Sequence, residues 1–191
     1  MTLEKGYANL EPKEIEGGCP VRVKKEAGGN LVIWSESPAE TEELGKILGG
    51  ILLPGDLFFL SGDLGSGKTL LVRGVTLGLA STETATSPTF ALIHRYEGEL
   101  PLYHLDLYRL AGAEDLAPLA LEEMMEEEAA FMIEWGDPAK EVLADTYMEI
   151  EFNRGEQAEE RILAFHPVGE RYRKINHSLW LALEKEQTTG K

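Results

Sequence analysis

The sequence predicts an α/β fold in which helices flank a mixed, largely parallel β-sheet. A short apolar run at residues 57–61 is followed by a glycine-rich stretch at 62–69, and residues 70–79 then show apolar positions at helical spacing. Two further pairs of extended runs are each typical of an antiparallel hairpin: 89–96 with 102–107, and 147–152 with 161–165. Together these observations indicate one α/β domain with one or two antiparallel hairpins.

The glycine-rich stretch matches the Walker A pattern G-x-x-x-x-G-K-[ST] at every fixed position. It consists of Gly62, Asp63, Leu64, Gly65, Ser66, Gly67, Lys68 and Thr69. In this motif successive backbone N–H groups point at a polyphosphate, and the following helix adds the positive end of its dipole. Lys68 would reach the β- and γ-phosphates, and the Thr69 hydroxyl would enter the shell of Mg²⁺. The flanking strand and helix supply the required context, so the sequence predicts a nucleotide-binding domain of the P-loop NTPase type.

Before the glycine-rich stretch, the sequence predicts one strand and one helix. Residues 31–34 are apolar and prone to form a strand. Residues 35–38 are a helix-start signal in which Pro38 suits the first turn. Apolar residues at 44, 47 and 48 would form one helix face until two glycines, Gly49 and Gly50, end the helix.

The helix after the loop has one apolar face, on which Leu71, Val75 and Leu79 recur every four residues. Gly74 and Gly78 lie between them and would let this helix pack closely on a sheet. The loop and its helix are therefore expected to be held firmly against the core.

Length and periodicity suggest how the chain is divided. Its 191 residues are enough for one globular domain with a core of its own. Residues 1–30 lack sustained periodicity, so we expect a loosely ordered extension there, although 21–23 would suit an edge strand. Residues 31–169 would form the P-loop domain. Residues 170–191 would add a short amphipathic helix, beginning at His177, and a polar tail.

Composition excludes several classes of protein. No apolar run approaches the ~20 residues of a membrane span, and the N-terminus is too polar for a secretory signal. Cys19 is the only cysteine, which rules out an internal disulfide and favours a reducing cytoplasm. The formal net charge is −16, from 34 acidic and 18 basic residues, and this disfavours direct binding to nucleic acid. Any RNA would therefore be held by a partner.

Residues 114–128 are expected to form an acidic helix. Apolar Leu121, Met124 and Met125 lie among five glutamates: Glu122, Glu123, Glu126, Glu127 and Glu128. These glutamates would be either a solvated helix face or a docking surface for a basic partner, and the pattern favours the solvated face.

Two carboxylates are candidates for metal or water chemistry. The apolar run 129–133 leads directly into Glu134, the position at which P-loop enzymes hold a second magnesium ligand; a carboxylate facing solvent is the alternative. Asp106 lies in an extended apolar run, where burial of an unpaired carboxylate is costly. We therefore expect a metal ion, water or basic partner beside Asp106, and a salt bridge to Arg109 is the alternative.

Three further features lie near these carboxylates in the sequence. Residues 87–89 (Ser-Pro-Thr) occupy the place of the segment that senses the γ-phosphate in many P-loop enzymes. Period-two geometry puts His104, Asp106 and Tyr108 on one face of their strand. His104 could hydrogen-bond near the site, but the pattern favours an ordinary strand histidine. Trp135 would either cover the nucleotide or pack in the core.

Several motifs together closely resemble the TsaE (YjeE) family of bacterial ATPases, which serve the threonylcarbamoyladenosine modification of tRNA. They are the phosphate loop, Arg73-Gly74, Ser87-Pro88-Thr89-Phe90, His104-Leu105-Asp106-Leu107-Tyr108-Arg109-Leu110 and Ile133-Glu134-Trp135, in this order. The phosphate loop is common to many NTPases, whereas the other blocks are specific. The family often has alanine where Ser66 stands.

The resemblance implies a small P-loop α/β domain with a mixed sheet that binds ATP and Mg²⁺ and hydrolyses ATP slowly alone. Family members act with TsaD and TsaB partners, which transfer threonylcarbamoyl to adenosine 37 of tRNA, and the ATPase supports multiple turnovers of that complex. The tRNA is reached through the complex rather than directly.

The resemblance also implies roles for individual residues. Lys68 and Thr69 would contact phosphate and Mg²⁺, Glu134 would be the magnesium carboxylate, Asp106 would act near the γ-phosphate, and Trp135 would lie close to the nucleotide. By the same resemblance, Thr41 would lie near the nucleobase and Arg161 would contact the nucleotide from the late hairpin.

Other functions would share the phosphate loop. A small-molecule kinase would carry a basic lid where residues 114–128 are acidic. A GTPase is disfavoured because the guanine-recognising N-K-x-D motif is absent. An ATP-gated binding module with incidental hydrolysis would differ from the favoured ATPase in its rate of turnover.

Overall fold

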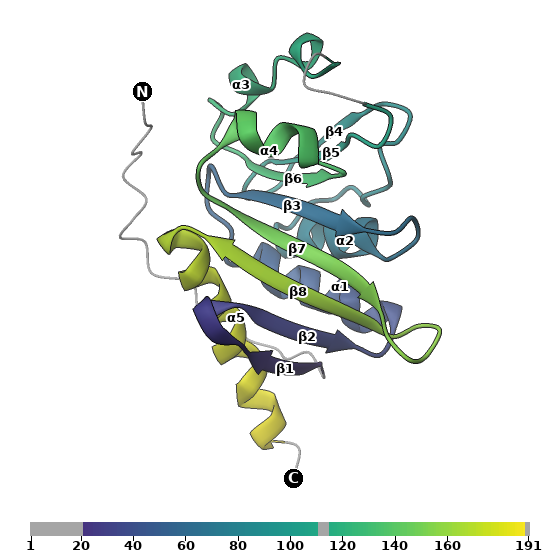
Figure 1. Cartoon of the computed structure of the whole chain (residues 1–191), viewed down its shortest axis with the longest axis vertical. Coiled ribbons are helices and arrows are strands. Elements are labelled where there is room, and N and C mark those ends of the chain that lie inside the picture. The colour runs from purple at the N-terminus through teal and green to yellow at the C-terminus, as the bar shows by residue number, and fades with distance from the viewer. Residues whose placement is uncertain (1–20, 111–114, 190–191) are drawn as a thin grey trace.

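The computed structural model describes residues 21–110 and 115–189, and residues 1–20, on which most of the expected N-terminal extension falls, lie outside the described part. An eight-stranded sheet with the order β1-β2-β8-β7-β3-β6-β5-β4 runs through the described part (Figure 1). Its strands are β1 Arg22–Lys25, β2 Leu31–Ser35, β3 Leu57–Gly62, β4 Ile93–Tyr96, β5 Leu102–Asp106, β6 Ala130–Glu134, β7 Tyr147–Arg154 and β8 Arg161–Val168. The helices are α1 Pro38–Gly49, α2 Lys68–Gly78, α3 Leu121–Met124, α4 Asp137–Leu143 and α5 Glu170–Thr189, with short 3-10 turns at Ala27–Gly29 and Ala117–Leu119.

The four central strands are parallel, and the strands on both sides pair antiparallel. β3 pairs in parallel with β6 and β7, and β5 pairs in parallel with β6. The β4–β5 and β7–β8 pairs are antiparallel, which confirms both predicted hairpins and the mixed sheet. Central parallel strands are buried on both faces, and this accounts for the uninterrupted apolar run of β3. Leu57, Phe58, Phe59 and Leu60 are each at most 1% exposed.

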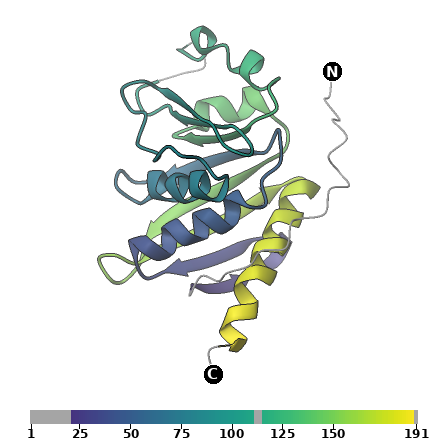
Figure 2. The same cartoon turned by 180° about the vertical axis from the view of Figure 1, so that it is seen from behind.

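Alternate residues of the sheet feed two apolar cores. Phe58 and Leu60 belong to the core beneath α1, α2 and α5, whereas Leu57 and Phe59 belong to the core beneath α3 and α4. Figure 2 shows α1, α2 and α5 together on one face of the sheet, and Figure 1 shows α4 on the opposite face. The chain is therefore a three-layered α/β structure built on one sheet.

Helices α1 and α2 approach each other closely because glycines face one another at the crossing. A Cβ atom added to Gly74 would clash with the carbonyl oxygen of Glu42, and one added to Gly45 would clash with that of Leu71. Gly74 and Gly78 do allow close packing, as predicted, but the element they pack against is α1 and not the sheet. The contact fixes the helix that starts at the phosphate loop.

Two of the expected elements are shorter than predicted. The expected acidic helix at 114–128 contains only the 3-10 turn at 117–119 and α3, and its first residue lies outside the described part. Pro118 lacks a backbone N–H, and Ala120 adopts the left-handed φ of 49°, so no continuous helix can pass through this segment. The first hairpin strand likewise starts only at Ile93, because Leu92 has a φ of 67°.

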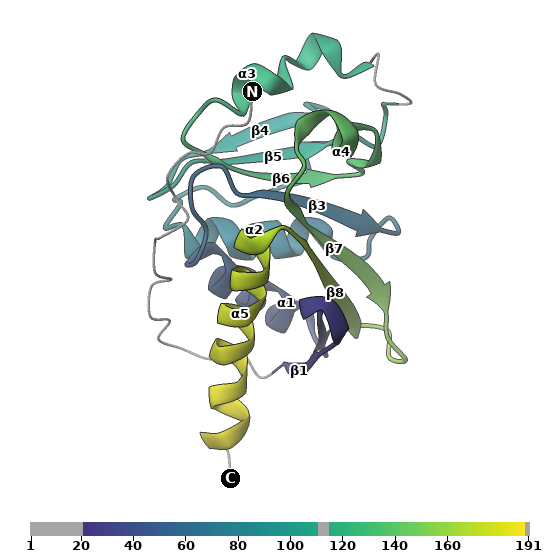
Figure 3. The same cartoon turned by 60° about the vertical axis from the view of Figure 1, so that its left-hand side comes forward.

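Two segments contain more structure than the sequence predicts. Helix α4, which begins with Pro138 in its first turn, had no predicted counterpart. The last helix begins at Glu170, seven residues before His177, and lies beside β8 and β1 (Figure 3). The predicted edge strand at 21–23 is confirmed as β1, although it spans residues 22–25.

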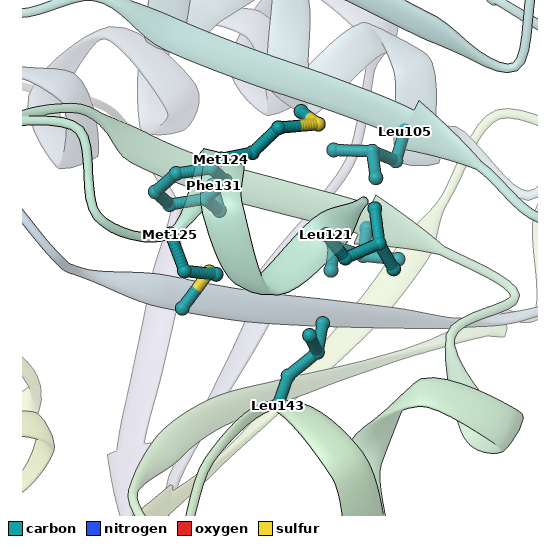
Figure 4. Close-up of a pocket in the computed structure, with 7 residues that line it drawn as sticks. Leu105, Leu121, Met124, Met125, Phe131 and Leu143 are labelled. Atoms are coloured by element: carbon teal, nitrogen blue, oxygen red, sulfur yellow. The ribbon is translucent and has the colours of Figure 1, made fainter. Parts of the chain in front are cut away.

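An apolar pocket lies between α3, α4, β5 and β6 (Figure 4). It is lined by Leu105, Leu121, Met124, Met125, Phe131, Ile133 and Leu143. None of these side chains is ionisable, and the pocket is a feature of packing between the helices and the sheet. Among the described residues, no helix is long and apolar enough to cross a bilayer.

A buried ion pair joins α5 to the start of β3. Arg171 donates from Nε to Asp56 Oδ1 at 2.9 Å and from Nη2 to Asp56 Oδ2 at 2.6 Å. The neighbouring Tyr172 hydroxyl accepts the Leu57 backbone N–H at 2.8 Å. Burial raises the pKa of Asp56, and the Arg171 guanidinium opposes that rise. These contacts explain why α5 begins before His177.

We expect Arg171→Met to lower the free energy of unfolding by about 3 kcal/mol at pH 7, because a buried carboxylate loses its cation. Without Arg171 the pKa of Asp56 rises further. Folded Asp56 then binds a proton more readily than the unfolded chain does, so the loss should shrink as the pH falls. Urea denaturation at pH 7 and pH 5 measures both effects.

Arg173→Met is the matched control for this experiment, because Arg173 forms only an exposed pair with Glu170 at 3.6 Å. It should change the free energy of unfolding by less than about 0.5 kcal/mol. Equal losses in the two variants, or a loss independent of pH, would contradict the assigned role of the Asp56–Arg171 pair.

Candidate functional site

The carboxyl ends of three parallel strands bring the predicted site residues to one edge of the sheet. β3 ends at the phosphate loop, β5 ends at Asp106 and β6 ends at Glu134. Asp106 is directly opposite Glu134, and Glu134 is opposite Leu60, two residues before Gly62. Ligands of open α/β sheets bind at this edge. The apolar pocket of Figure 4 lies elsewhere and includes none of these residues.

The phosphate loop has the backbone that its glycines permit. Gly62, Gly65 and Gly67 have φ values of 129°, 75° and 106°, in the region that side chains disfavour. Asp63, Leu64 and Gly65 are exposed, whereas Ser66 is buried and its hydroxyl has no hydrogen-bond partner among the described residues. Within the described part of the chain, no hydrogen bond from that hydroxyl contributes to the shape of the loop.

Lys68 is buried beneath the loop, only 4% exposed. Its ammonium group donates to the carbonyl oxygens of Gly62 at 2.7 Å and Asp63 at 3.0 Å, and lies 4.4 Å from the centre of the Trp135 ring. Burial lowers the pKa of Lys68, while Glu134 is the first of the carboxylates that oppose this. The amine is therefore a desolvated cation held at the base of the loop.

Glu134 is buried and hydrogen-bonded, so the alternative of a solvent-facing carboxylate is wrong. It is 4% exposed, and its Oε1 accepts the Thr69 hydroxyl at 2.7 Å. The same oxygen lies 3.0 Å from His104 Nε2. The sequence therefore predicted correctly that Glu134 and Thr69 lie together, and the structure adds His104 to them.

Asp106 is held by hydroxyl groups rather than by a cation. Its Oδ2 accepts from Thr89 Oγ1 at 2.5 Å and from Ser87 Oγ at 3.2 Å, and its Oδ1 accepts the Tyr108 backbone N–H at 3.1 Å. The alternative salt bridge to Arg109 does not form, since that guanidinium lies 4.7 Å from the centre of the Phe90 ring. Asp106 thus anchors the Ser-Pro-Thr segment at the site.

Trp135 lies beside the loop in a strained conformation. Its φ of 58° is unusual for a residue with a large side chain. The ring is half-buried, packs edge-on against Tyr108 with centroids 5.0 Å apart, and lies over Lys68. Trp135 therefore lies beside the phosphate loop and belongs to neither apolar core, and its position over a nucleotide stays a prediction.

The two residues carried over from the family by resemblance differ in their positions. Arg161 donates from Nε to the Ser66 carbonyl oxygen at 2.9 Å, so it holds the loop from the β7–β8 hairpin. Thr41 is 1% exposed, and its hydroxyl is paired with Ser35 Oγ at 2.8 Å. No contact between Thr41 and the loop is observed within the described residues, so its role near the nucleobase stays a prediction.

The oxygen atoms of the site fit a magnesium ion whose other ligands would be phosphates and water. Within residues 21–110 and 115–189, no group of three or more His, Cys, Asp or Glu side chains forms a metal cluster. Mg²⁺ in nucleotide sites needs only one or two protein oxygens beside waters and phosphates. Thr69 Oγ1 and Glu134, in direct contact, can supply them.

His104 is the functional residue that the sequence pattern favoured as an ordinary strand histidine. That interpretation is wrong, because the structure places its ring on Glu134. The available signal was the H-x-D spacing, which puts His104 and Asp106 on the same strand face.

This chain is similar to known proteins over most of its length. The family model "Threonylcarbamoyl adenosine biosynthesis protein TsaE" matches residues 35–163. Proteins named "tRNA threonylcarbamoyladenosine biosynthesis protein TsaE" include one from Bacillus subtilis, 35% identical over 144 residues, which cover 75% of this chain and 89% of that protein. Another from Streptomyces coelicolor is 37% identical over 137 residues, 68% of this chain and 92% of that protein. The crystal structure of Bacillus subtilis YdiB superposes with a TM-score of 0.66 and 31% identity, over 83% of this chain and 95% of that chain.

We expect Lys68→Met to leave the free energy of unfolding at pH 7 unchanged or raised. The lowered pKa of Lys68 means that the folded protein holds the charged amine less favourably than the unfolded chain does. This disadvantage disappears as the pH rises through the unfolded value near 10.5, so any gain in the variant should be greatest at neutral pH and shrink toward that value. Denaturation at pH 7 and pH 10 measures it.

Lys46→Met is the control, since Lys46 forms an exposed pair with Glu43 on α1. A clear destabilisation by Lys68→Met at pH 7, absent from Lys46→Met, would instead mean that the bonds to the Gly62 and Asp63 carbonyls stabilise the loop.

Proposed function

This chain belongs to the TsaE family, and from that premise we propose that it is the ATP-binding and ATP-hydrolysing accessory protein of tRNA threonylcarbamoyladenosine biosynthesis. The observation that carries the proposal is the contact between Thr69 of the phosphate loop and Glu134 at the end of β6. A hydroxyl of the loop and a carboxylate of the neighbouring strand are the protein ligands that P-loop enzymes use for the magnesium of a bound nucleotide.

The loop and its helix would bind the nucleotide. Backbone N–H groups of the loop and the N-terminus of α2 offer an anion site, and Lys68 supplies the cation. Thr69 and Glu134 would hold a Mg²⁺ ion, which would supply charge neutralisation during transfer of the γ-phosphoryl group. Arg161 would keep the loop in register through the Ser66 carbonyl oxygen.

Asp106 would orient the groups around the γ-phosphate. It already holds the hydroxyls of Ser87 and Thr89. A carboxylate that accepts hydroxyl hydrogens can equally accept from a water molecule, so Asp106 would position the attacking water or the Ser-Pro-Thr segment. Phosphoryl transfer demands such positioning rather than covalent participation.

The partners would be the TsaD and TsaB subunits of the transferase, with tRNA reached through them. A net charge of −16 repels a phosphate backbone, which supports contact with tRNA through the complex rather than directly. A reaction that modifies adenosine 37 of tRNA would take place in the cytoplasm. A kinase lid is not favoured by the acidic segment at 115–128, which contains no lysine or arginine.

The first test is reconstitution of adenosine-37 modification with TsaD–TsaB, a threonylcarbamoyl donor, tRNA and ATP. Multiple turnovers should require this protein. The Lys68→Ala variant should not support multiple turnovers. It should also bind ATP roughly 10- to 100-fold more weakly, since a charge-assisted bond contributes about 1.5–3 kcal/mol. Turnover that is independent of the protein would leave an ATP-gated binding module or a kinase as the function.

The second test concerns the magnesium carboxylate. Glu134→Gln should preserve the fold but lower kcat for Mg²⁺-dependent ATP hydrolysis at least about 100-fold, the scale of losing one charge-stabilising group. Thermal unfolding controls for stability, and Glu43→Gln on the surface of α1 controls for loss of a negative charge. Full activity of Glu134→Gln would assign the metal to another carboxylate.

A further inference from the structure

His104 is a buried polar residue whose only side-chain hydrogen bond, within the described residues, is to Glu134. It lies in the middle of β5, between Met132 of β6 and His94 of β4. Its side chain is fully buried, and its Nε2 lies 3.0 Å from Glu134 Oε1. A strand position with no exposure would ordinarily take an apolar residue, because a buried polar group must recover its desolvation cost through a hydrogen bond.

The hydrogen bonds fix which ring nitrogen carries the proton. An ionised carboxylate only accepts, so His104 Nε2 must donate to Glu134 Oε1. The other ring nitrogen, Nδ1, is buried and has no partner among the described residues. An unpaired lone pair at Nδ1 costs less than an unpaired N–H would, so the geometry favours donation from Nε2 with Nδ1 left without a partner.

The hydroxyl of the neighbouring Tyr96 does not hydrogen-bond to His104. The Tyr96 ring lies 6.5 Å away, centroid to centroid, but the Tyr96 hydroxyl is bonded to the backbone of Thr86 and to His94. The hydrogen-bonding capacity of His104 is therefore directed at Glu134.

Glu134 is consequently fixed through one of its two oxygens. Oε1 accepts from both Thr69 Oγ1 and His104 Nε2. No hydrogen bond to Oε2 from the described residues is observed. Two donors on a single oxygen restrict rotation of the carboxylate, and they leave the second oxygen to contacts from outside the chain.

We propose that His104 is a positioning residue that orients Glu134 for magnesium binding. This inference rests on the proposed function, because the Glu134 carboxylate that His104 orients is the proposed magnesium ligand. Partners that orient metal-binding carboxylates typically change metal affinity or activity 10- to 100-fold when they are removed. His104 would act through Glu134 without touching nucleotide or metal.

The test compares two substitutions at this position. His104→Gln retains an N–H donor near the position of Nε2, whereas His104→Leu fills similar space without a donor. Isothermal titration calorimetry with ADP measures affinity with and without Mg²⁺. We expect His104→Leu to raise the Mg²⁺ concentration for half-maximal stimulation of ADP binding at least about 10-fold, with metal-free ADP binding unchanged. His104→Gln should restore much of the wild-type value.

His94→Leu is the matched control, because His94 faces His104 on the adjoining strand but has no contact with Glu134. It should leave the Mg²⁺ requirement unchanged. In hydrolysis assays His104→Leu should lower kcat at fixed Mg²⁺ while the KM for ATP changes little. A loss of structure alone would instead weaken metal-free ADP binding and act equally in His104→Gln.

The outcomes separate this inference from the proposed function. Wild-type protein that binds ADP with Mg²⁺, together with a folded His104→Leu that has an unchanged Mg²⁺ requirement, overturns the positioning role alone. Wild-type protein that binds no ADP or ATP under any condition overturns the proposed function and this inference with it.

Nitrogen NMR of the wild-type imidazole decides the case if His104→Leu does not fold. The expected spectrum shows a proton on Nε2, and the Nε2 chemical shift should change in Glu134→Gln. A ring without a proton on Nε2, or an Nε2 shift that is the same in Glu134→Gln, overturns the proposal.

Discussion

The geometry of the candidate site depends on keeping a buried cation and two buried carboxylates together at one edge of the sheet. Lys68, Asp106 and Glu134 are each 4% exposed. Charges removed from water are tolerated only where partners satisfy them, and here every one of the three has several. The loop carbonyls hold Lys68, hydroxyls hold Asp106, and Thr69 and His104 hold Glu134. The proposed ATP hydrolysis would use this same arrangement of satisfied charges.

The rest of the fold fixes the positions of these groups. Parallel pairing of β5 with β6 sets Asp106 opposite Glu134, and the pairing of β3 with β6 brings the phosphate loop beside them. The glycine contact between α1 and α2 fixes the helix that carries Thr69. Each constraint acts on the backbone, so the side chains need little adjustment of their own. Preorganisation of this kind is what phosphoryl transfer requires from a protein.

Sequence reasoning succeeded where the determinants are local. Consecutive positions define the phosphate loop, and the apolar run before Glu134 could only be a buried strand of the central sheet. It failed where neighbours distant in the chain decide. Gly74 packs against α1 rather than the sheet, and His104 gained its partner only through the register of β5 with β6. The prediction of a continuous acidic helix failed for another reason. Pro118 and the left-handed Ala120 interrupt a segment whose composition favours a helix.

The antiparallel half of the sheet is coupled to the site, although it carries none of the buried charges there. β7 pairs in parallel with β3, and β8 returns from it so that Arg161, at the start of β8, reaches the Ser66 carbonyl oxygen. At the other end of β3, Asp56 is bound by Arg171 of α5. The strand that leads into the phosphate loop is thus held at both ends by the later part of the chain. Movement of the loop relative to β3 would have to break the Arg161 contact, whereas movement of α5 would act on the start of the strand. The C-terminal third of the molecule therefore supports the geometry on which the site depends.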